Sequence, residues 1–198
     1  MLRLEDFGTI FMLTSLLGAL AISSPALAFV LPSQTRERFS ELYVLGPNHM
    51  AEDYPFNVKT NKTYKIYIGI NNHIGSSAYY ELDIKLRNQT EQLPNSTISI
   101  PSPLPTIYKF QVLLIDNGNW ETPLEFSLSG LSFSRNKCRV DWLTVNGVAF
   151  HVEKNSSWNS ENKGFYLQLF FELWIYDLES SSFTFNNRFV GIWLNMTG

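Results

Sequence analysis

Three histidines are the residues of this chain best suited to metal binding or acid–base chemistry. His49, His73 and His151 lie in separate segments, and no H-x-x-x-H or similar ligand spacing joins them. The chain also lacks a G-x-S-x-G nucleophile turn, a P-loop and a glycine-rich dinucleotide turn. Acidic pairs such as Glu37 with Glu41 occur by chance in any chain of this kind. The sequence therefore predicts no catalytic residue, no metal site and no cofactor, and we expect a protein that is not an enzyme.

A run of aromatic side chains is the clearest functional signal in the sequence. Residues 164–177 alternate between two faces, and one face carries Tyr166, Phe170, Trp174 and Tyr176. Exposed aromatic rings can stack on sugars or on a partner protein. The alternative is that this face packs beneath a loop or against a second sheet. These four residues form the candidate binding face, with a cell-surface protein or a glycan as the expected partner.

Asparagine sequons, charge and cysteine content place further bounds on function. Five asparagines stand in N-x-[ST] sequons and are candidate glycosylation sites on an extracytoplasmic body: Asn61, Asn88, Asn95, Asn155 and Asn195. The net charge is −3 and no basic patch occurs, which argues against a nucleic-acid partner. Cys138 is the single cysteine, so no internal disulfide can form. Two interpretations of Cys138 remain open, a buried small residue or a thiol used between molecules.

The elements that must position these residues read as β-strands. Period-two patterns predict strands at 42–45, 64–72, 78–88, 107–115, 124–129, 140–152 as a hairpin, 164–177 and 182–196. Asn146-Gly147 predicts a type I′ turn in that hairpin, because such a turn requires positive φ at both positions. Residues 48–63 and 153–163 read as polar loops. The predicted fold is all-β, an antiparallel two-sheet sandwich of immunoglobulin-like type preceded by one N-terminal apolar helix.

The segment 78–88 has the most regular alternation in the chain. Apolar residues Tyr80, Leu82, Ile84 and Leu86 alternate with Glu81, Asp83, Lys85 and Arg87. We therefore expect the apolar face to be buried and the charged face to be in contact with water. Residues 88–106 follow and contain four prolines, which predict an exposed crossing loop without strand or helix.

The N-terminal stretch is apolar, with no charged side chain from Phe7 through Thr35. About 20 apolar residues suffice to cross a bilayer, so this stretch is either an uncleaved membrane anchor or a signal peptide cut after Ala28. Glu5 and Asp6 offset the charge of Arg3, which favours the anchor. The expected organisation is a membrane anchor or signal segment over 1–31, a polar juncture over 32–41 and an extracytoplasmic β domain over 42–198.

Several segments together resemble a known family. They are ERFSELYVLGP (37–47), YPFNV (54–58), IYIGINNHIGSSAYYELDI (66–84), NGNWETPLEFSL (117–128) and NRFVGIWLNMT (187–197). These segments are similar to the uncharacterised archaeal membrane-protein family named domain of unknown function 1616 (DUF1616), over roughly residues 35–197. The resemblance implies an N-terminal membrane helix followed by an extracytoplasmic β domain. This chain departs from many members in having one such helix instead of several, and the family supplies no catalytic residue.

These observations lead to one expected function and one alternative. The expectation is a single-pass protein of the cell membrane, bound to the membrane through its N-terminal helix, with a noncatalytic binding or envelope-structural domain outside. The alternative is a secreted filament subunit, in which cleavage at Ala28 frees residues 29–45 to insert as a strand into a neighbour's sheet.

Overall fold

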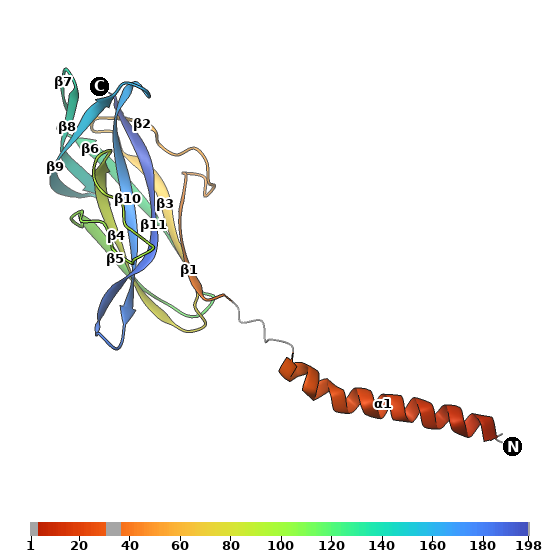
Figure 1. Ribbon diagram of the computed structural model, residues 1–198. Coiled ribbons are helices and arrows are strands. Elements are labelled where there is room, and N and C mark those ends of the chain that lie inside the picture. Colours follow the sequence, from red (N-terminus) through yellow and green to blue (C-terminus); the bar gives the residue numbers. More distant parts are fainter. Residues whose placement is uncertain (1–3, 31–36, 198) are drawn as a thin grey trace. The chain divides into compact units, whose positions relative to one another are not determined.

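The structure, a computed structural model, describes the backbone of residues 4–30 and 37–197 and the side chains of residues 7–20 and 37–197. The chain divides into two compact units between Arg38 and Phe39. The first contains one helix, α1 (Leu4–Val30), and the second is built of strands (Figure 1). The β unit thus begins three residues earlier than the sequence predicts. Residues 32–36 of the predicted polar juncture lie outside the described part of the chain.

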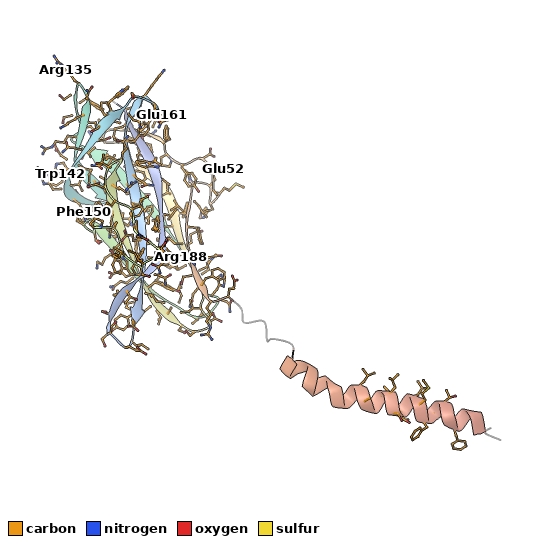
Figure 2. All side chains as sticks on the ribbon, viewed as in Figure 1. Glu52, Arg135, Trp142, Phe150, Glu161 and Arg188 are labelled. Atoms are coloured by element: carbon orange, nitrogen blue, oxygen red, sulfur yellow. The ribbon has the colours of Figure 1, made fainter. Side chains whose placement is uncertain are left out.

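Helix α1 presents large apolar side chains to its surroundings. Figure 2 shows side chains on opposite sides of this helix. The large apolar ones that the structure describes are exposed: Phe7, Ile10, Phe11, Met12, Leu13, Leu16, Leu17 and Leu20. Successive residues of a helix are turned by about 100°, so these positions are spread around the whole axis. Within the part of the chain that the structure describes, no helix has the length and apolar character of a membrane span.

The β unit confirms the all-β prediction. Its strands are β1 (Phe39–Leu45), β2 (Asn57–Lys59), β3 (Tyr64–His73), β4 (Ala78–Asn88), β5 (Tyr108–Leu114), β6 (Asn119–Ser129), β7 (Ser132–Ser134), β8 (Lys137–Val145), β9 (Val148–Asn159), β10 (Gly164–Asp177) and β11 (Ser182–Thr197). The strand order is β1-β3-β6-β8-β9-β10-β11-β2, with β4 beside β10, β5 beside β4 and β7 beside β8. All of these pairs are antiparallel except β2 with β11.

The sheet curls on itself and encloses one hydrophobic core (Figure 1). Strands β3 and β10 both contribute fully buried residues to this core. They are Ile66, Ile68 and Ile70 from β3 and Leu167, Leu169 and Phe171 from β10. Strand β4 contributes the apolar side of its alternating pattern, as its sequence predicts. The fold is therefore sandwich-like, and β10 lies within it between β4 and β11.

The hairpin of β8 and β9 shows where sequence periodicity succeeds and fails. Asn146 and Gly147 have φ angles of 48° and 81°, which confirms the predicted turn. The predicted loop 153–163 is wrong over residues 153–159, because β9 continues through Asn159. It pairs with β8 as far as Ser157 and then with β10. Polar residues can occupy a strand whose outer face meets water, and Ser156 turns inward to donate a 2.8 Å hydrogen bond to the Tyr166 carbonyl. The short strands β2 and β7 are too brief to produce a readable period.

Candidate functional site

The aromatic face of β10 is the first candidate, and its four residues do not form one exposed platform. Phe170 is fully buried and packs against Phe189. Tyr166 is also buried, although it lines a pocket described below. Trp174 and Tyr176 are partly exposed at the other end of the strand. The four residues therefore do not form the single exposed platform that the sequence suggests, because Phe170 in the middle of the face is buried.

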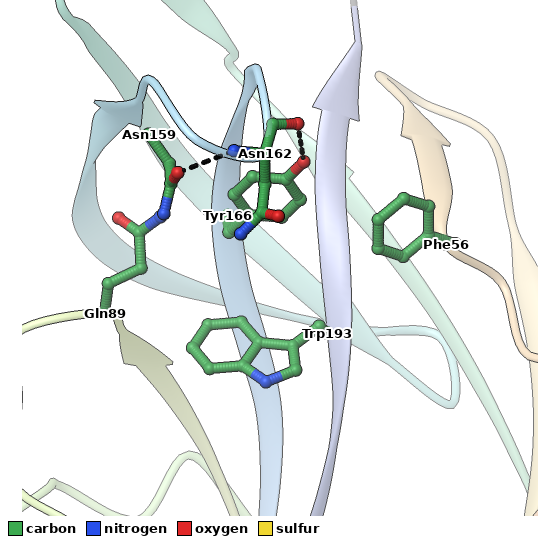
Figure 3. A pocket seen from close by; sticks show the side chains of 6 residues that line it. All are labelled: Phe56, Gln89, Asn159, Asn162, Tyr166 and Trp193. Atoms are coloured by element: carbon green, nitrogen blue, oxygen red, sulfur yellow. Dashed lines mark hydrogen bonds between the residues drawn. The ribbon is translucent and has the colours of Figure 1, made fainter.

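A pocket lined by aromatic rings and amides lies at the Tyr166 end of β10. Figure 3 shows its six lining residues, which come from four separate segments of the chain: Phe56, Gln89, Asn159 with Asn162 and Tyr166, and Trp193. We call this the aromatic–amide pocket, and its volume is about 450 Å³. Phe56 precedes β2, Trp193 lies on β11, and the two asparagines lie at the turn between β9 and β10. Apart from the asparagines and Tyr166, which lie close together in the sequence, these residues come from distant parts of the chain. Only the fold brings them together into a pocket.

Hydrogen bonds hold the polar wall of the aromatic–amide pocket in place. The Tyr166 hydroxyl donates to the Asn162 carbonyl at 2.6 Å, and the Asn162 backbone N–H donates to the Asn159 side-chain oxygen at 2.9 Å (Figure 3). The Phe56 ring lies 5.9 Å from the Tyr166 ring between centroids. Trp193 and Phe56 remain 38% and 48% exposed, so part of each ring is accessible to a ligand, although the Arg87 guanidinium lies over the Trp193 ring at 5.6 Å from its centroid. Uncharged rings beside amide groups suit a neutral ligand with both apolar faces and hydroxyl groups.

The charged face of β4 is the second candidate, and the expectation that it meets water is wrong. Glu81, Asp83, Lys85 and Arg87 are all buried. The cover is the proline-rich segment 89–107, which we call the crossing loop. It contains one isolated bridge, between Asn95 and Ile100, and otherwise no regular structure. Proline prevents a helix or a central strand but does not prevent packing, so the loop lies on the sheet and buries charges.

A buried ion pair lies beneath the crossing loop. The Lys85 Nζ lies 2.6 Å from the Glu172 Oε2, and the two side chains are 3% and 0% exposed. Glu172 also accepts a 2.9 Å hydrogen bond from the Ser102 backbone N–H through its other oxygen. The Lys85 Nζ lies 5.8 Å above the Trp174 ring. Each charge on this pair is therefore matched by a partner, as burial requires.

Hydrogen bonds at its start, middle and end fasten the crossing loop to the sheet. At its start, the Arg87 Nε donates to the Glu91 carbonyl at 2.8 Å. In its middle, Ser102 bonds Glu172 as described. At its end, the Thr106 hydroxyl donates to the Asp83 Oδ2 at 2.6 Å. Burial raises the pKa of Asp83, while the Thr106 hydrogen bond and the Lys85 charge act against that rise.

The remaining sequence-predicted residues stay apart. His49 pairs with Glu121 at 2.6 Å, while His73 and His151 lie near other carboxylates. Among the described residues no group of three His, Cys, Asp or Glu side chains could hold a metal. Cys138 is buried with a free thiol, and burial raises its pKa to about 11. A thiol in this state is mostly protonated and weakly reactive near neutral pH.

The five sequon asparagines differ in their surroundings. Asn61, Asn95 and Asn155 are exposed. Asn88 is partly buried, and its side-chain nitrogen donates to the Asn155 carbonyl at 3.2 Å. Asn195 lies within β11, and its side-chain nitrogen donates to the Asn57 side chain at 2.9 Å. A glycan on Asn88 or Asn195 would replace one of the two side-chain N–H groups beside these hydrogen bonds, so these two sites are less open to modification than the exposed ones.

A comparison with family models decides the relationship of the chain. The model described as "Domain of unknown function (DUF1616)" matches residues 32–163, more than half of the sequence. The chain belongs to the DUF1616 family. The matched range contains four of the five segments that carry the resemblance and includes β1 through β9. The NRFVGIWLNMT segment on β11, which contains Trp193, lies beyond it.

No curated protein sequence matches this DUF1616 chain. Among solved structures, a β-glucosidase from Listeria innocua in complex with glucose is similar over 82% of the chain and 16% of its own, at 11% identity and a TM-score of 0.37. The chain thus spans about a sixth of that enzyme. A CARDB domain from Pyrococcus furiosus, in complex with di-metal ions, is similar over 80% of this chain and 90% of its own, at 9% identity and a TM-score of 0.37. At such scores neither likeness supports an argument about function.

Proposed function

We propose that this DUF1616 protein is a membrane-anchored, extracytoplasmic binding protein without catalytic activity. Its β domain would be a sandwich of immunoglobulin-like type that binds a neutral glycan in the aromatic–amide pocket. The observation that carries this proposal is the composition of that pocket, in which three aromatic rings adjoin three amide side chains. Rings bury the apolar faces of a sugar, and amides both donate to and accept from its hydroxyls.

The proposed anchor rests on the N-terminal sequence. The uncharged stretch continues to Thr35, beyond the residues whose side chains are described, so its support comes from the sequence. The large apolar side chains of α1 at residues 7–20 are exposed around the whole axis. Exposing a helix that is apolar on all sides to water is unfavourable, whereas the hydrocarbon core of a bilayer accommodates such a helix. The exposed sequons at Asn61, Asn95 and Asn155 suit a domain that lies outside the cell.

Replacing Trp193 with alanine should weaken glycan binding by roughly five- to thirtyfold. The lost stacking and burial amount to about 1–2 kcal/mol, and 1.4 kcal/mol corresponds to a factor of ten. The measurement is binding of the full chain to arrayed neutral oligosaccharides, followed by titration with the best binder. Because the Trp193 ring is 38% exposed, its loss should leave the fold intact.

Trp142 offers a matched control for this experiment. It is also a tryptophan on a strand (labelled in Figure 2), 43% exposed, and it packs against His151. It is not among the residues that line the pocket. Trp142→Ala should bind the same glycan with unchanged affinity. Equal losses in both variants, or no arrayed glycan retained by the unaltered chain, would contradict the proposed pocket.

The N-terminus of the native protein tests the anchor. We expect an intact mass that retains Met1 or Leu2, in a membrane pellet that resists carbonate washing, because the uncharged stretch would remain in the bilayer. Treatment that removes glycans should lower that mass if the domain lies outside.

A soluble protein that begins at Phe29 would instead support secretion and the filament alternative. That alternative faces a structural cost, since residues 39–45 already pair with β3 as strand β1. Donating them to a neighbour would require all seven of those pairs to separate.

A further inference from the structure

A second cavity, independent of the aromatic–amide pocket, lies between the crossing loop and the outer face of β4 and β10. Its volume is about 420 Å³. The sheet contributes Glu81, Asp83, Lys85 and Trp174, and the loop contributes residues 101–104 and Thr106. We call it the sub-loop cavity. It lies at the Trp174 end of β10, eight residues along the strand from Tyr166, which is roughly 26 Å at 3.3 Å per residue.

Three polar atoms of the residues that line the sub-loop cavity have no hydrogen-bond partner. They are the Asp83 Oδ1, the Ser102 Oγ and the Trp174 Nε1. Asp83 and Ser102 are only 5% and 6% exposed. A buried polar atom without a partner costs about 1–3 kcal/mol, and it is rare in folded proteins. Asp83, Ser102 and Trp174 all line one cavity, so we expect a single ligand that enters it to satisfy the three atoms together.

The chemistry of these three atoms selects the ligand. The Asp83 oxygen accepts a hydrogen bond, the Trp174 nitrogen donates one, and the Ser102 hydroxyl does either. Hydroxyl groups both donate and accept, so a molecule that carries several of them matches the set. The Trp174 ring, with Phe183 also lining the cavity, offers an apolar surface for its carbon faces.

The charges around the sub-loop cavity argue against an ionic ligand. Lys85 already neutralises Glu172 and lies 3.9 Å from the Asp83 Oδ2, so its ammonium group opposes a cation. Glu81 is held by Lys109 at 3.0 Å and, with Asp83, opposes an anion. A neutral ligand avoids both penalties.

We infer that the sub-loop cavity is a binding site for a neutral polyhydroxylated ligand, a single sugar unit in size. One ligand hydroxyl donates a hydrogen bond to the Asp83 Oδ1, a second accepts one from the Trp174 Nε1–H, and a third forms a hydrogen bond with the Ser102 hydroxyl. The inference does not rest on the glycan pocket at Trp193, since the two sites share no lining residue.

The test uses the indole N–H signals of the five tryptophans as reporters in nuclear magnetic resonance spectra. The full chain is held in a zwitterionic detergent without a sugar headgroup and titrated with glucose, mannose, galactose and N-acetylglucosamine to millimolar concentrations. Each indole signal is assigned from its Trp→Phe variant. We expect at least one sugar to shift the Trp174 signal in a saturable way, because its N–H acquires an acceptor.

Ser102→Ala is the decisive variant. The Ser102 hydroxyl has no protein partner, while its backbone N–H continues to bond Glu172, so the variant should fold normally. The sugar affinity reported by Trp174 should fall about three- to tenfold, and Asp83→Asn should lower it about tenfold. The response of Trp193 to the same sugars should be unchanged in both variants.

The outcomes separate the two sites. A Trp174 signal that no sugar shifts, or equal affinities in the unaltered chain and in Ser102→Ala and Asp83→Asn, would overturn the inference even if Trp193 responds. A saturable Trp174 shift that Ser102→Ala weakens would support it even if the aromatic–amide pocket binds nothing.

Discussion

Replacing Lys85 with methionine should destabilise the β domain by about 3–5 kcal/mol, the cost of removing one partner of a buried ion pair. The change would leave the Glu172 carboxylate completely buried, with the Ser102 N–H as its remaining partner. Methionine keeps an unbranched apolar stem like that of lysine and lacks only an equivalent of the terminal ammonium group, so the loss reports mainly the charge and not a large cavity. The measurement is urea unfolding of the full chain in detergent, followed by tryptophan fluorescence.

Two further variants determine whether burial of the charge is the cause. Lys109 lies on the same face, but its side chain is exposed and pairs with Glu81 at 3.0 Å. Lys109→Met should therefore lower the free energy of unfolding by less than about 1 kcal/mol. The double variant Lys85→Met, Glu172→Gln should regain most of the stability. It removes both charges and retains an oxygen to accept the Ser102 N–H. Similar losses for Lys85→Met and Lys109→Met would show that burial of the Glu172 charge is not the cause of the lost stability.

The same ion pair shows what the sequence can and cannot reveal. The alternation of β4 correctly assigns Lys85 and Asp83 to one face, because side chains of a strand alternate by geometry. Periodicity does not say what covers a face. The cover is a loop whose prolines predict irregular backbone correctly, but Pro94, Ser102 and Leu104 within it are buried. Whether a loop packs depends on contacts with distant residues, which no local pattern records.

The aromatic–amide pocket could be predicted only in part for a related reason. Tyr166 is singled out by the aromatic run on β10, but Trp193, Phe56 and Gln89 come from three distant segments. The one sequence feature that pointed toward Trp193 is that it is an aromatic residue in the alternating pattern of the last strand. To place Trp193 in the pocket, one would need to know that β11 pairs with β10 in the register that sets Trp193 opposite Gln168, beside Tyr166. Register across a sheet is set by the whole core, so the pocket emerges from the fold.

A buried asparagine is the other feature that the sequence did not reveal. Asn72, at the end of β3, is fully buried. Its side-chain nitrogen donates to the carbonyls of Ser76, Leu114 and Ile115 at 2.8, 3.1 and 3.0 Å. Its side-chain oxygen accepts from the Tyr80 hydroxyl at 3.1 Å. Three carbonyls around one atom fix the orientation of the amide and join the β3–β4 turn to the end of β5.

Asn72→Leu should therefore destabilise the β domain by roughly 3 kcal/mol or more. Leucine matches asparagine in branching but leaves several buried groups without a partner, at about 1–3 kcal/mol for each. Asn71→Leu is the matched control. The Asn71 side chain is only partly buried and bonds Glu41 at 2.6 Å, so its replacement should cost less than about 1.5 kcal/mol. Both variants are measured by the same urea unfolding.

Asn72→Asp removes the side-chain N–H donors of Asn72 and keeps the size and shape of the side chain, so it tests the donors alone. The new carboxylate would face three carbonyl oxygens, so its pKa should be raised in the folded state. A raised folded pKa means that stability is greatest below the unfolded pKa of about 3.9 and falls as the pH rises through the folded value. The variant should thus lose more stability at pH 7 than at pH 4, relative to the unaltered chain. A loss independent of pH, or no loss in Asn72→Leu, would show that the amide does not hold this turn.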